Sequence, residues 1–301
     1  MSPPDAAAPR SGLVVIVGRP NVGKSTLLNR LVGEKVAIVS RKPQTTRNRI
    51  LGVVNRPGGQ IVLFDTPGIH KPQHEMNERM VGAAIRTLAQ VELALWLVDV
   101  TQAPGPGDAF VRERLAAAGR PVLLGINKID RVPKPRILPA IDSYRAMHDF
   151  LEIVPLSALT GDNVELLAER LLAHLPEGEP LYPPDYLTDQ PERFLAAEMV
   201  RERILEHTRE ELPYSVGVIV DSFEELPRLV RIHASVLVER PGQKAILIGK
   251  GGTMLKRVGS EAREQIEGLL GAKVYLGLFV KVRPRWREDP KLLDEVGLER
   301  R

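Results

Sequence analysis

Hydrophobic positions in the first 175 residues fall into short, nearly continuous runs of four to eight residues rather than into alternating patterns. Such runs, rich in Val, Ile and Leu, are typical of parallel strands buried on both faces. They are LVVIVG from Leu13, IVLFD from Ile61, LALWLVDV from Leu93, PVLLGIN from Pro121 and EIVPLSA from Glu152. Stretches of helical period lie between them: STLLNRLVG, NERMVGAAIRTLAQ, DAFVRERLAAAG and NVELLAERLLAHL. This alternation predicts a doubly wound α/β domain with a mostly parallel sheet.

Two interruptions of the pattern are informative. In NRILGVVNRPGGQIVLFD, the turn residues RPGG separate two strand-like runs, which predicts an antiparallel hairpin and hence one antiparallel edge strand. The segment from Leu175 to Pro191 is too rich in proline to continue a helix or a sheet, so we expect a linker there.

The pattern after the linker is different. A long helical run, PERFLAAEMVRERILEHTREEL, precedes two strand-like runs, two helical pieces around a glycine loop, and a last strand, KVYLGLFVKVR. This order predicts a smaller α+β domain. We therefore expect a disordered leader over residues 1–12, a first domain over 13–175, a linker over 176–191, and a second domain with a C-terminal tail over 192–301.

Composition narrows the class of protein. Hydrophobic residues make up 43% of 301 residues, which favours a folded chain of two domains. Cysteine is absent, which excludes disulfides, thiol chemistry and Cys-ligated zinc and fits a reducing compartment. The first twelve residues lack the apolar core of a signal peptide, and no run approaches the roughly 18 apolar residues of a membrane span.

The loop GRPNVGKS, Gly18 to Ser25, matches the phosphate-binding pattern G-x-x-x-x-G-K-[ST]. It follows a predicted strand and opens a predicted helix, so its backbone N–H groups and the helix N-terminus can bind phosphate oxygens. Lys24 would reach the β- and γ-phosphates, and the Ser25 hydroxyl would bind Mg²⁺. A glycine turn without a ligand is the alternative, but it does not account for strand, spacing and helix together.

Three further motifs follow predicted strands, where an open α/β sheet binds its ligands. In NKID, Asn127 to Asp130, a carboxylate can accept two N–H donors from the guanine edge, an arrangement that adenine lacks. In DTPG, the aspartate Asp65 can hold Mg²⁺ through water, and Gly68 can offer its N–H to the γ-phosphate. SAL begins at Ser157. An ATPase or kinase with a basic appendage is disfavoured by NKID.

Together with QTTR, these motifs resemble those of the translation-factor-related small GTPases. The resemblance implies that Asn127 and Asp130 bind guanine, that Lys128 braces the phosphate loop, and that the Ala158 backbone contacts the guanine oxygen. It also implies a switch threonine, Thr45 or Thr46, that reaches Mg²⁺ in the GTP state; we favour Thr46 and thus a metal site of Ser25, Thr46 and Asp65. The expected nucleotide-binding residues are Gly18, Arg19, Pro20, Asn21, Val22, Gly23, Lys24, Ser25, Thr26, Asp65, Asn127, Lys128, Asp130, Ser157 and Ala158.

A second glycine loop lies in LIGKGGTMLKR, from Leu247 to Arg257. A second nucleotide site is disfavoured because no Lys-Ser/Thr follows the last glycine. A KH domain fits better, because its G-x-x-G loop clamps the backbone of about four nucleotides.

Residues 240–287 carry eleven basic and three acidic side chains, a net charge of +8 against +4 for the whole chain. Such a field attracts a polyanion; a solvated basic surface, or a helix-turn-helix with packing glycines, remains the alternative. The expected RNA-binding residues are Lys244, Gly249, Lys250, Gly251, Gly252, Lys256 and Arg257.

A P-loop GTPase domain followed by a type II KH domain resembles the Era family of bacterial ribosome-assembly GTPases, from about Leu13 to Arg287. The resemblance implies binding of GTP and GDP, binding of small-subunit ribosomal RNA near its 3′ end, and a role in maturation of the small ribosomal subunit. It further implies a cytoplasmic protein, expected to be a monomer, with peripheral association with the inner face of the cell membrane. A nucleotide-gated RNA-binding switch or chaperone on another RNA, in which hydrolysis only resets the state, stays open.

Hydrolysis must proceed without the usual water-orienting glutamine, because Ile69 follows the DTPG motif. We therefore expect slow intrinsic turnover that depends on Lys24, Asn21, Thr46 and Gly68, with His70 as a weak candidate base. Other GTPases with an apolar residue at this position and Asn in the phosphate loop resemble this chain, and in them K⁺, held partly by that Asn, lies where an arginine finger would. Asn21 either binds K⁺ or only caps the loop by local hydrogen bonds.

Overall fold

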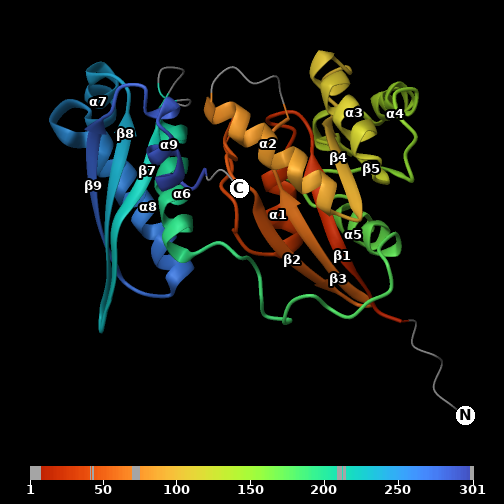
Figure 1. The fold of residues 1–301 in the computed structure, drawn as a ribbon, viewed down its shortest axis with the longest axis horizontal. Coiled ribbons are helices and arrows are strands. Elements are labelled where there is room, and N and C mark those ends of the chain that lie inside the picture. Colours follow the sequence, from red (N-terminus) through yellow and green to blue (C-terminus); the bar gives the residue numbers. More distant parts are fainter. Residues whose placement is uncertain are drawn as a thin grey trace, which may run out of the picture. The chain divides into compact units, whose positions relative to one another are not determined.

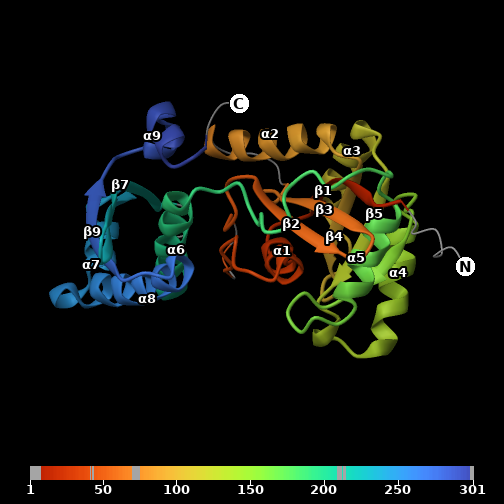
Figure 2. The same ribbon diagram turned by 90° about the horizontal axis from the view of Figure 1, so that it is seen from below.

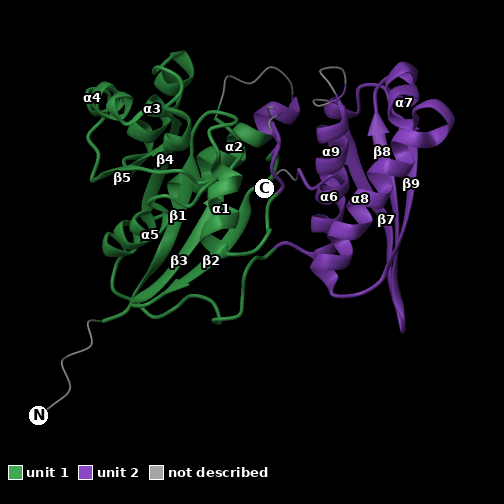
Figure 3. Cartoon of the chain, turned by 180° about the vertical axis from the view of Figure 1, so that it is seen from behind, with its two compact units in different colours: residues 1–37, 46–71, 80–189 green, residues 38–45, 72–79, 190–301 purple. Residues whose placement is uncertain are grey.

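The computed structural model describes residues 8–40, 42, 44–69, 75–208, 212 and 215–298. The chain divides into two compact units, coloured separately in Figure 3. Unit 1 comprises residues 1–37, 46–71 and 80–189, and unit 2 comprises residues 38–45, 72–79 and 190–301. The two segments from the first half of the chain that belong to unit 2 were not anticipated, because the sequence pattern predicts two domains that are each continuous.

Unit 1 is built on a six-stranded sheet of order β2-β3-β1-β4-β5-β6. Its strands are β1 (Arg10–Val17), β2 (Ile50–Arg56), β3 (Gly59–Asp65), β4 (Leu93–Asp99), β5 (Val122–Asn127) and β6 (Ile153–Pro155). All neighbours pair in parallel except β2, which is antiparallel to β3 at the edge of the sheet. The predicted hairpin and the predicted mostly parallel sheet are both confirmed.

Helices cover both faces of this sheet (Figures 1 and 2). Those described are α1 (Lys24–Val32), α2 (Glu75–Gln90), α3 (Pro106–Ala118), α4 (Ile137–Arg145) and α5 (Val164–Ala173), with 3-10 turns at Ile129–Arg131 and Lys134–Arg136. Leucines of α1 and α5 pack on one face, and α2, α3 and α4 pack on the other. The continuous apolar runs follow from this, because both faces of each strand are buried.

Helix α4 was missed by the hydrophobic pattern. Its sequence begins ILPA, and Pro139 reads as a helix breaker, yet it lies in the first turn, where the missing N–H has no helical partner. The buried side chain of Tyr144 attaches the helix to the sheet by an edge-to-face contact with Trp96, 5.9 Å between ring centroids.

The expected leader ends too late at residue 12, because β1 already begins at Arg10. The guanidinium of Arg10 donates to the carbonyl oxygens of Ala173 and Leu175, 3.2 and 2.6 Å away. The charged side chain at the start of β1 thus pairs with two carbonyl oxygens, one in the last residue of α5 and one just beyond it.

The proline-rich segment is attached to unit 1 rather than extended freely. The backbone N–H of Val53 in edge strand β2 donates to the carbonyl of Leu187 at 2.9 Å. The buried amide of Gln60 accepts from the backbone N–H groups of Leu181 and Tyr182 and donates to the carbonyl of Tyr182. The segment thus covers the open edge of the sheet, which removes unpaired donors that would otherwise face solvent.

Unit 2 has a three-stranded sheet of order β7-β8-β9, antiparallel and then parallel. Its elements are α6 (Glu192–His207), β7 (Gly217–Leu226), β8 (Leu229–Val238), α7 (Pro241–Ile248), a 3-10 turn (Lys250–Gly252), α8 (Thr253–Leu270), β9 (Val274–Val282), a 3-10 turn (Trp286–Glu288) and α9 (Pro290–Glu295). Their order confirms the predicted type II KH arrangement. Apolar residues of α6, α7 and α8 form its core with the sheet. Among the described residues, no helix is both long and apolar enough to span a bilayer.

Candidate nucleotide site and nucleic-acid interface

The phosphate loop connects β1 to α1, and its conformation requires glycine at two positions. Gly18 and Gly23 have φ of 153° and 104°. A Cβ on Gly18 would lie 2.3 Å from the carbonyl oxygen of Leu97, and one on Gly23 would lie 2.3 Å from Nδ2 of Asn127. Asn21, with φ of 63°, is the non-glycine residue of the loop in the left-handed region, which asparagine tolerates better than most residues.

Lys24 is buried directly behind this loop. Its Nζ donates to the carbonyl of Arg19 at 3.2 Å and lies 3.5 Å from that of Gly18. Burial lowers the pKa of the Lys24 ammonium, and the nearby Asp65 carboxylate opposes that shift. Phosphate oxygens bound in the loop would offset the cost of burying the charged ammonium of Lys24.

The three predicted metal ligands lie together. The hydroxyl of Ser25 donates to Oδ2 of Asp65 at 2.6 Å and lies 2.7 Å from Oγ1 of Thr46, which is itself 3.3 Å from the same carboxylate oxygen. Thr45 takes no part, because its hydroxyl donates to the carbonyl of Lys42. Of the two threonines, the geometry favours Thr46.

This oxygen cluster fits a hard divalent cation. Oδ1 of Asp65 is buried and has no hydrogen-bond partner among the described residues. Burial raises the pKa of Asp65, against the attraction of Lys24 and the hydrogen bonds from Ser25 and Thr46. Carboxylate and hydroxyl oxygens in such a setting are ligands that Mg²⁺ accepts, and its charge would offset the cost of burying the carboxylate.

The DTPG motif packs against the phosphate loop. A Cβ on Gly68 would lie 2.7 Å from the backbone N of Pro20, so only glycine allows this approach. The N–H of Ile69 donates to the carbonyl of Gly18 at 3.1 Å, and its side chain is fully buried. The position of the usual glutamine is therefore part of the core; His70 lies outside the described residues.

Asn127 connects the two predicted guanine-binding motifs, NKID and SAL, to the phosphate loop by hydrogen bonds. Its Nδ2 donates to the carbonyl of Val22 at 2.7 Å, and its Oδ1 accepts from the N–H of Ala158 at 2.9 Å. Asp130 is placed by the buried Ser157, whose hydroxyl donates to Oδ1 at 2.6 Å. Oδ2 lies 4.0 Å from Nε of the exposed Arg131, so the carboxylate keeps acceptor capacity for a guanine edge.

Lys128 contacts both the phosphate loop and Asp99, a residue that lies outside the sequence motifs. Its Nζ donates to the carbonyl of Asn21 at 2.7 Å and to Oδ2 of Asp99 at 2.6 Å. Burial opposes ionisation of Asp99, but hydrogen bonds from Lys128 and Thr101 outweigh it and hold the pKa of Asp99 below its ordinary value. Asp99 ends β4, and its position at the carboxyl end of a buried strand was the signal that could have identified it.

Two expected nucleotide-binding residues are less directly placed. The side chain of Arg19 is directed to α3, where Nε lies 3.2 Å from Oδ1 of the buried Asp108. Its backbone alone remains for phosphate. Thr26 follows Ser25 in the first turn of α1 and is half-buried.

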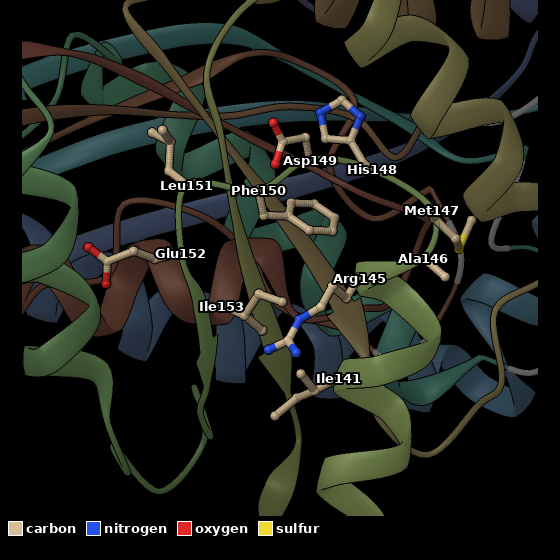
Figure 4. Close-up of a pocket in the computed structure, with 10 residues that line it drawn as sticks. All are labelled: Ile141, Arg145, Ala146, Met147, His148, Asp149, Phe150, Leu151, Glu152 and Ile153. Carbon is tan, nitrogen blue, oxygen red and sulfur yellow. The ribbon is translucent and has the colours of Figure 1, made fainter.

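The cavity in Figure 4, of about 740 Å³, does not belong to this site. Its lining comes from the end of α4 and the segment that enters β6, including Ile141, Arg145 and Phe150. That segment precedes β6, whereas the nucleotide motifs follow the carboxyl ends of their strands.

The second glycine loop joins α7 to α8 in unit 2. Gly249, Gly251 and Gly252 have φ of 73°, 60° and 78°. No atom of the described residues lies within 4 Å of a Cβ built on Gly251 or Gly252. Lys250, Lys256 and Arg257 are exposed around the loop and Lys244 is half-buried. The loop therefore presents open backbone amid positive charge.

Arg257 shares its charge with an acidic neighbour. Its Nε donates to Oε1 of Glu261 at 3.0 Å, and Oε2 of that carboxylate contacts Nε2 of His207 at 2.6 Å. Both contacts lower the pKa of Glu261, and the hydrogen bond with His207 contributes most. We therefore expect Arg257 to contribute less to an anion than Lys250 or Lys256.

Comparison with known proteins matches a family profile in each half of the chain. The profile of a family described as 50S ribosome-binding GTPase matches residues 13–128, and that of the KH domain matches residues 211–287. GTPase Era of Heliobacterium modesticaldum is 50% identical over 291 residues, covering 96% of this chain and 97% of its own. GTPase Era of Geotalea uraniireducens is 52% identical over 291 residues, covering 96% and 98%.

Two solved structures are similar over nearly the whole chain. A single-residue variant of Aquifex aeolicus Era bound to GDP·AlF4⁻ has a TM-score of 0.93 at 43% identity and covers 96% of this chain and 99% of its own. Era in complex with MgGDPNP and nucleotides 1506–1542 of 16S ribosomal RNA has a TM-score of 0.94 at 43% identity and covers 97% and 99%. With both sets of motifs in place and this similarity from end to end, the chain belongs to the Era family of GTPases.

Proposed function

We propose that this GTPase uses its KH domain to bind small-subunit ribosomal RNA near the 3′ end, and that it assists maturation of the small ribosomal subunit in a cycle of GTP binding and hydrolysis. The observation that carries the proposal is the open G-x-x-G loop. Its glycines are in the left-handed region and face empty space at Gly251 and Gly252. A sugar-phosphate backbone can approach such a loop closely, and the lysines beside it supply charge.

The relative solved with nucleotides 1506–1542 of 16S ribosomal RNA supports the choice of RNA. The family description that mentions the 50S subunit covers residues 13–128 and so says nothing of the KH domain. The test is a binding titration with an RNA of that 3′-terminal sequence and a scrambled RNA of the same length, each with a non-hydrolysable GTP analogue. We expect at least tenfold tighter binding of the 3′-terminal RNA; equal affinity would contradict the assignment.

The alternative is a nucleotide-gated switch on another RNA, with hydrolysis only as reset. Both functions require the same sequence motifs, so the motifs cannot distinguish them. The response of GTP turnover to ribosomal subunits can. We expect purified small subunits to stimulate GTP turnover and large subunits to leave it unchanged. Unchanged turnover with both would favour the alternative.

For hydrolysis, we assign Mg²⁺ to Ser25, Thr46 and Asp65, where it would neutralise charge between the β- and γ-phosphates. Lys24 and the N–H of Gly68 would then bind the γ-phosphate from the protein side. Ile69 offers no side-chain hydrogen bond, and it is fully buried, so it cannot orient water. Slow intrinsic turnover follows.

No glutamine is assigned to orient water or to stabilise the charge that develops between the β- and γ-phosphates during hydrolysis. We therefore propose a second ion, K⁺, held partly by Asn21. The left-handed backbone of Asn21 also fits a purely local role, because asparagine is favoured there. GTP turnover in KCl and in NaCl at equal ionic strength tests the ion. Asn21→Gly keeps the backbone conformation and removes the side chain, whereas Asn21→Ala removes the side chain and strains the backbone. Equal wild-type rates in both salts would rule out K⁺; a K⁺ effect that survives in Asn21→Gly would remove Asn21 from its ligands.

A cytoplasmic location, peripheral contact with the membrane and a monomeric state stay predictions from the family resemblance.

A further inference from the structure

The segment that precedes the metal ligand Thr46 is fixed at both ends by side chains of helix α6. Residues 38–45 belong to unit 2, as does α6, and share its colour in Figure 3. At one end, the N–H of Val39 donates to Oε1 of Glu202 at 2.8 Å. At the other, a guanidinium nitrogen of Arg201 donates to the carbonyl oxygen of Thr45.

Arg201 is held in one orientation. Its Nε and one terminal nitrogen donate to the two carboxylate oxygens of Glu198, one turn earlier on α6, at 2.7 and 2.6 Å. Its side chain is only 2% exposed. A bidentate pair in so confined a space fixes the plane of the guanidinium, and with it the direction of the bond to Thr45.

The carbonyl of Thr45 lies in the same rigid peptide plane as the N–H and Cα of Thr46. A donor that fixes this carbonyl therefore also fixes the plane from which the Thr46 side chain departs. That side chain meets Ser25 at 2.7 Å and Asp65 at 3.3 Å. Arg201 lies outside every nucleotide motif of the sequence, yet it is one peptide plane away from a metal ligand.

We propose that Arg201 is a positioning residue for the magnesium and GTP site: it orients the Thr45–Thr46 peptide so that Thr46 reaches Mg²⁺ in the GTP state. The inference rests on the assignment of Thr46 to Mg²⁺ under the proposed function. It makes GTP affinity, but not GDP affinity, depend on a helix of the KH unit, because Thr46 is assigned to the metal in the GTP state.

The experiment is a double-mutant cycle in the full chain between Arg201→Met and Thr46→Ala. Affinities for a non-hydrolysable GTP analogue and for GDP are measured at saturating Mg²⁺, and the Mg²⁺ requirement is measured separately. We expect Arg201→Met to weaken the GTP analogue about tenfold, to leave GDP within about twofold, and to raise the Mg²⁺ concentration for half-maximal binding. In the Thr46→Ala background, Arg201→Met should cost nothing further, because residues that act through one contact are not additive.

The matched control is Arg193→Met, since Arg193 lies on the same helix and donates to the carbonyls of Val220 and Asp221 within unit 2. It should leave both nucleotide affinities unchanged. Arg201→Met could lower the folding stability, because Glu198 loses its partner. Arg201→Lys then serves as the second variant: it keeps the charge without the planar guanidinium, and it should lower the affinity for the GTP analogue about threefold.

Additive losses in the cycle, equal losses for GTP analogue and GDP, or no loss in either Arg201 variant would each overturn the proposal. A Thr46→Ala variant with unchanged affinity for the GTP analogue would instead overturn the metal assignment on which it rests. RNA binding enters none of these measurements, so failure of the RNA proposal would be seen separately.

Discussion

The two glycine loops of this chain look alike in sequence but differ in what surrounds them. In the phosphate loop, a Cβ on Gly18 or Gly23 would collide with the chain itself, at Leu97 or Asn127. In the KH loop, a Cβ on Gly251 or Gly252 would meet nothing within 4 Å. The described chain therefore packs closely against both glycines of the first loop, whereas in the second loop only Gly249 is crowded, by Met254. Positive φ requires glycine in both loops, but tight packing adds to that requirement at Gly18 and Gly23 and not at Gly251 and Gly252.

Gly23→Ala tests the packing of the first loop most severely. The added methyl would lie against Asn127 at a φ of 104°, so the phosphate loop or the base motif must move. We expect affinity for both GTP and GDP to fall about 100-fold, or about 2.7 kcal/mol. Isothermal titration of both nucleotides checks this.

Gly33→Ala is the control for Gly23→Ala, because Gly33 has a φ of 87° but nothing within 4 Å. It should cost about 1 kcal/mol of folding stability and leave nucleotide affinity within about twofold. Equal loss of affinity in both variants would show that backbone strain, not the contact with Asn127, is what matters.

Asp130→Asn tests the predicted guanine-binding residue in the same unit. The amide presents a donor where guanine also presents donors, so GTP affinity should fall about tenfold or more while XTP affinity rises. Ser157 still fixes the side chain through its hydroxyl, so the fold should be kept. Competition between GTP and XTP for the variant checks the shift; unchanged GTP affinity would reject Asp130 as the guanine-binding residue.

Asp99→Asn should have the smallest effect, because it removes only the brace behind Lys128. We expect GTP and GDP affinity to fall about threefold each. Glu165→Gln, which removes an exposed ion pair with Arg56 from the same unit, is the control and should change neither affinity.

The Asp99–Lys128 pair also predicts little pH dependence. The pKa of Asp99 is lowered from an ordinary value of 3.8, so its stabilising contribution is complete above that value and is lost only as the pH falls through the lower folded pKa. Between about pH 5 and 8 this pair should not change nucleotide affinity. Titrations of wild type and Asp99→Asn across that range should therefore run parallel.

Sequence alone predicted the elements whose burial is complete or whose motif is local. The continuous runs of β1, β4 and β5 were sufficient to predict the sheet, and the motifs that follow them lie at the carboxyl ends of its strands. The binding of nucleotide by these motif residues stays a prediction. Helix α9 was missed, although Asp289 followed by Pro290 is a recognisable helix start, and Asp289 accepts from the N–H of Lys291 at 3.0 Å.

Only some contacts between distant segments could be predicted. Asp99 ends β4 and Lys128 follows β5, so strand ends alone bring these two residues to one edge of the sheet. Nothing in the sequence pairs Arg201 with Thr45, because neither residue lies in a pattern that the other shares. The proline-rich segment is a further example. Its composition excludes helix and sheet, but only the structure shows that the carbonyl of Leu187 accepts a hydrogen bond from Val53 in the edge strand β2.

The division of labour between the two loops is tested most directly by replacing GKGG with GDDG, that is Lys250→Asp with Gly251→Asp. Gly251 has a φ of 60° and open space, and aspartate tolerates that conformation, so the fold should persist. Gly119→Asp with Lys134→Asp makes the same change of charge in unit 1, again at a glycine with φ of 61° and open space. We predict that the loop variant binds the 3′-terminal RNA more than tenfold more weakly, a loss of about 1.4 kcal/mol or more. Its GTP turnover, and the RNA affinity of the control variant, should stay within about twofold of wild type. Retained RNA affinity together with a fall in GTP turnover would contradict it.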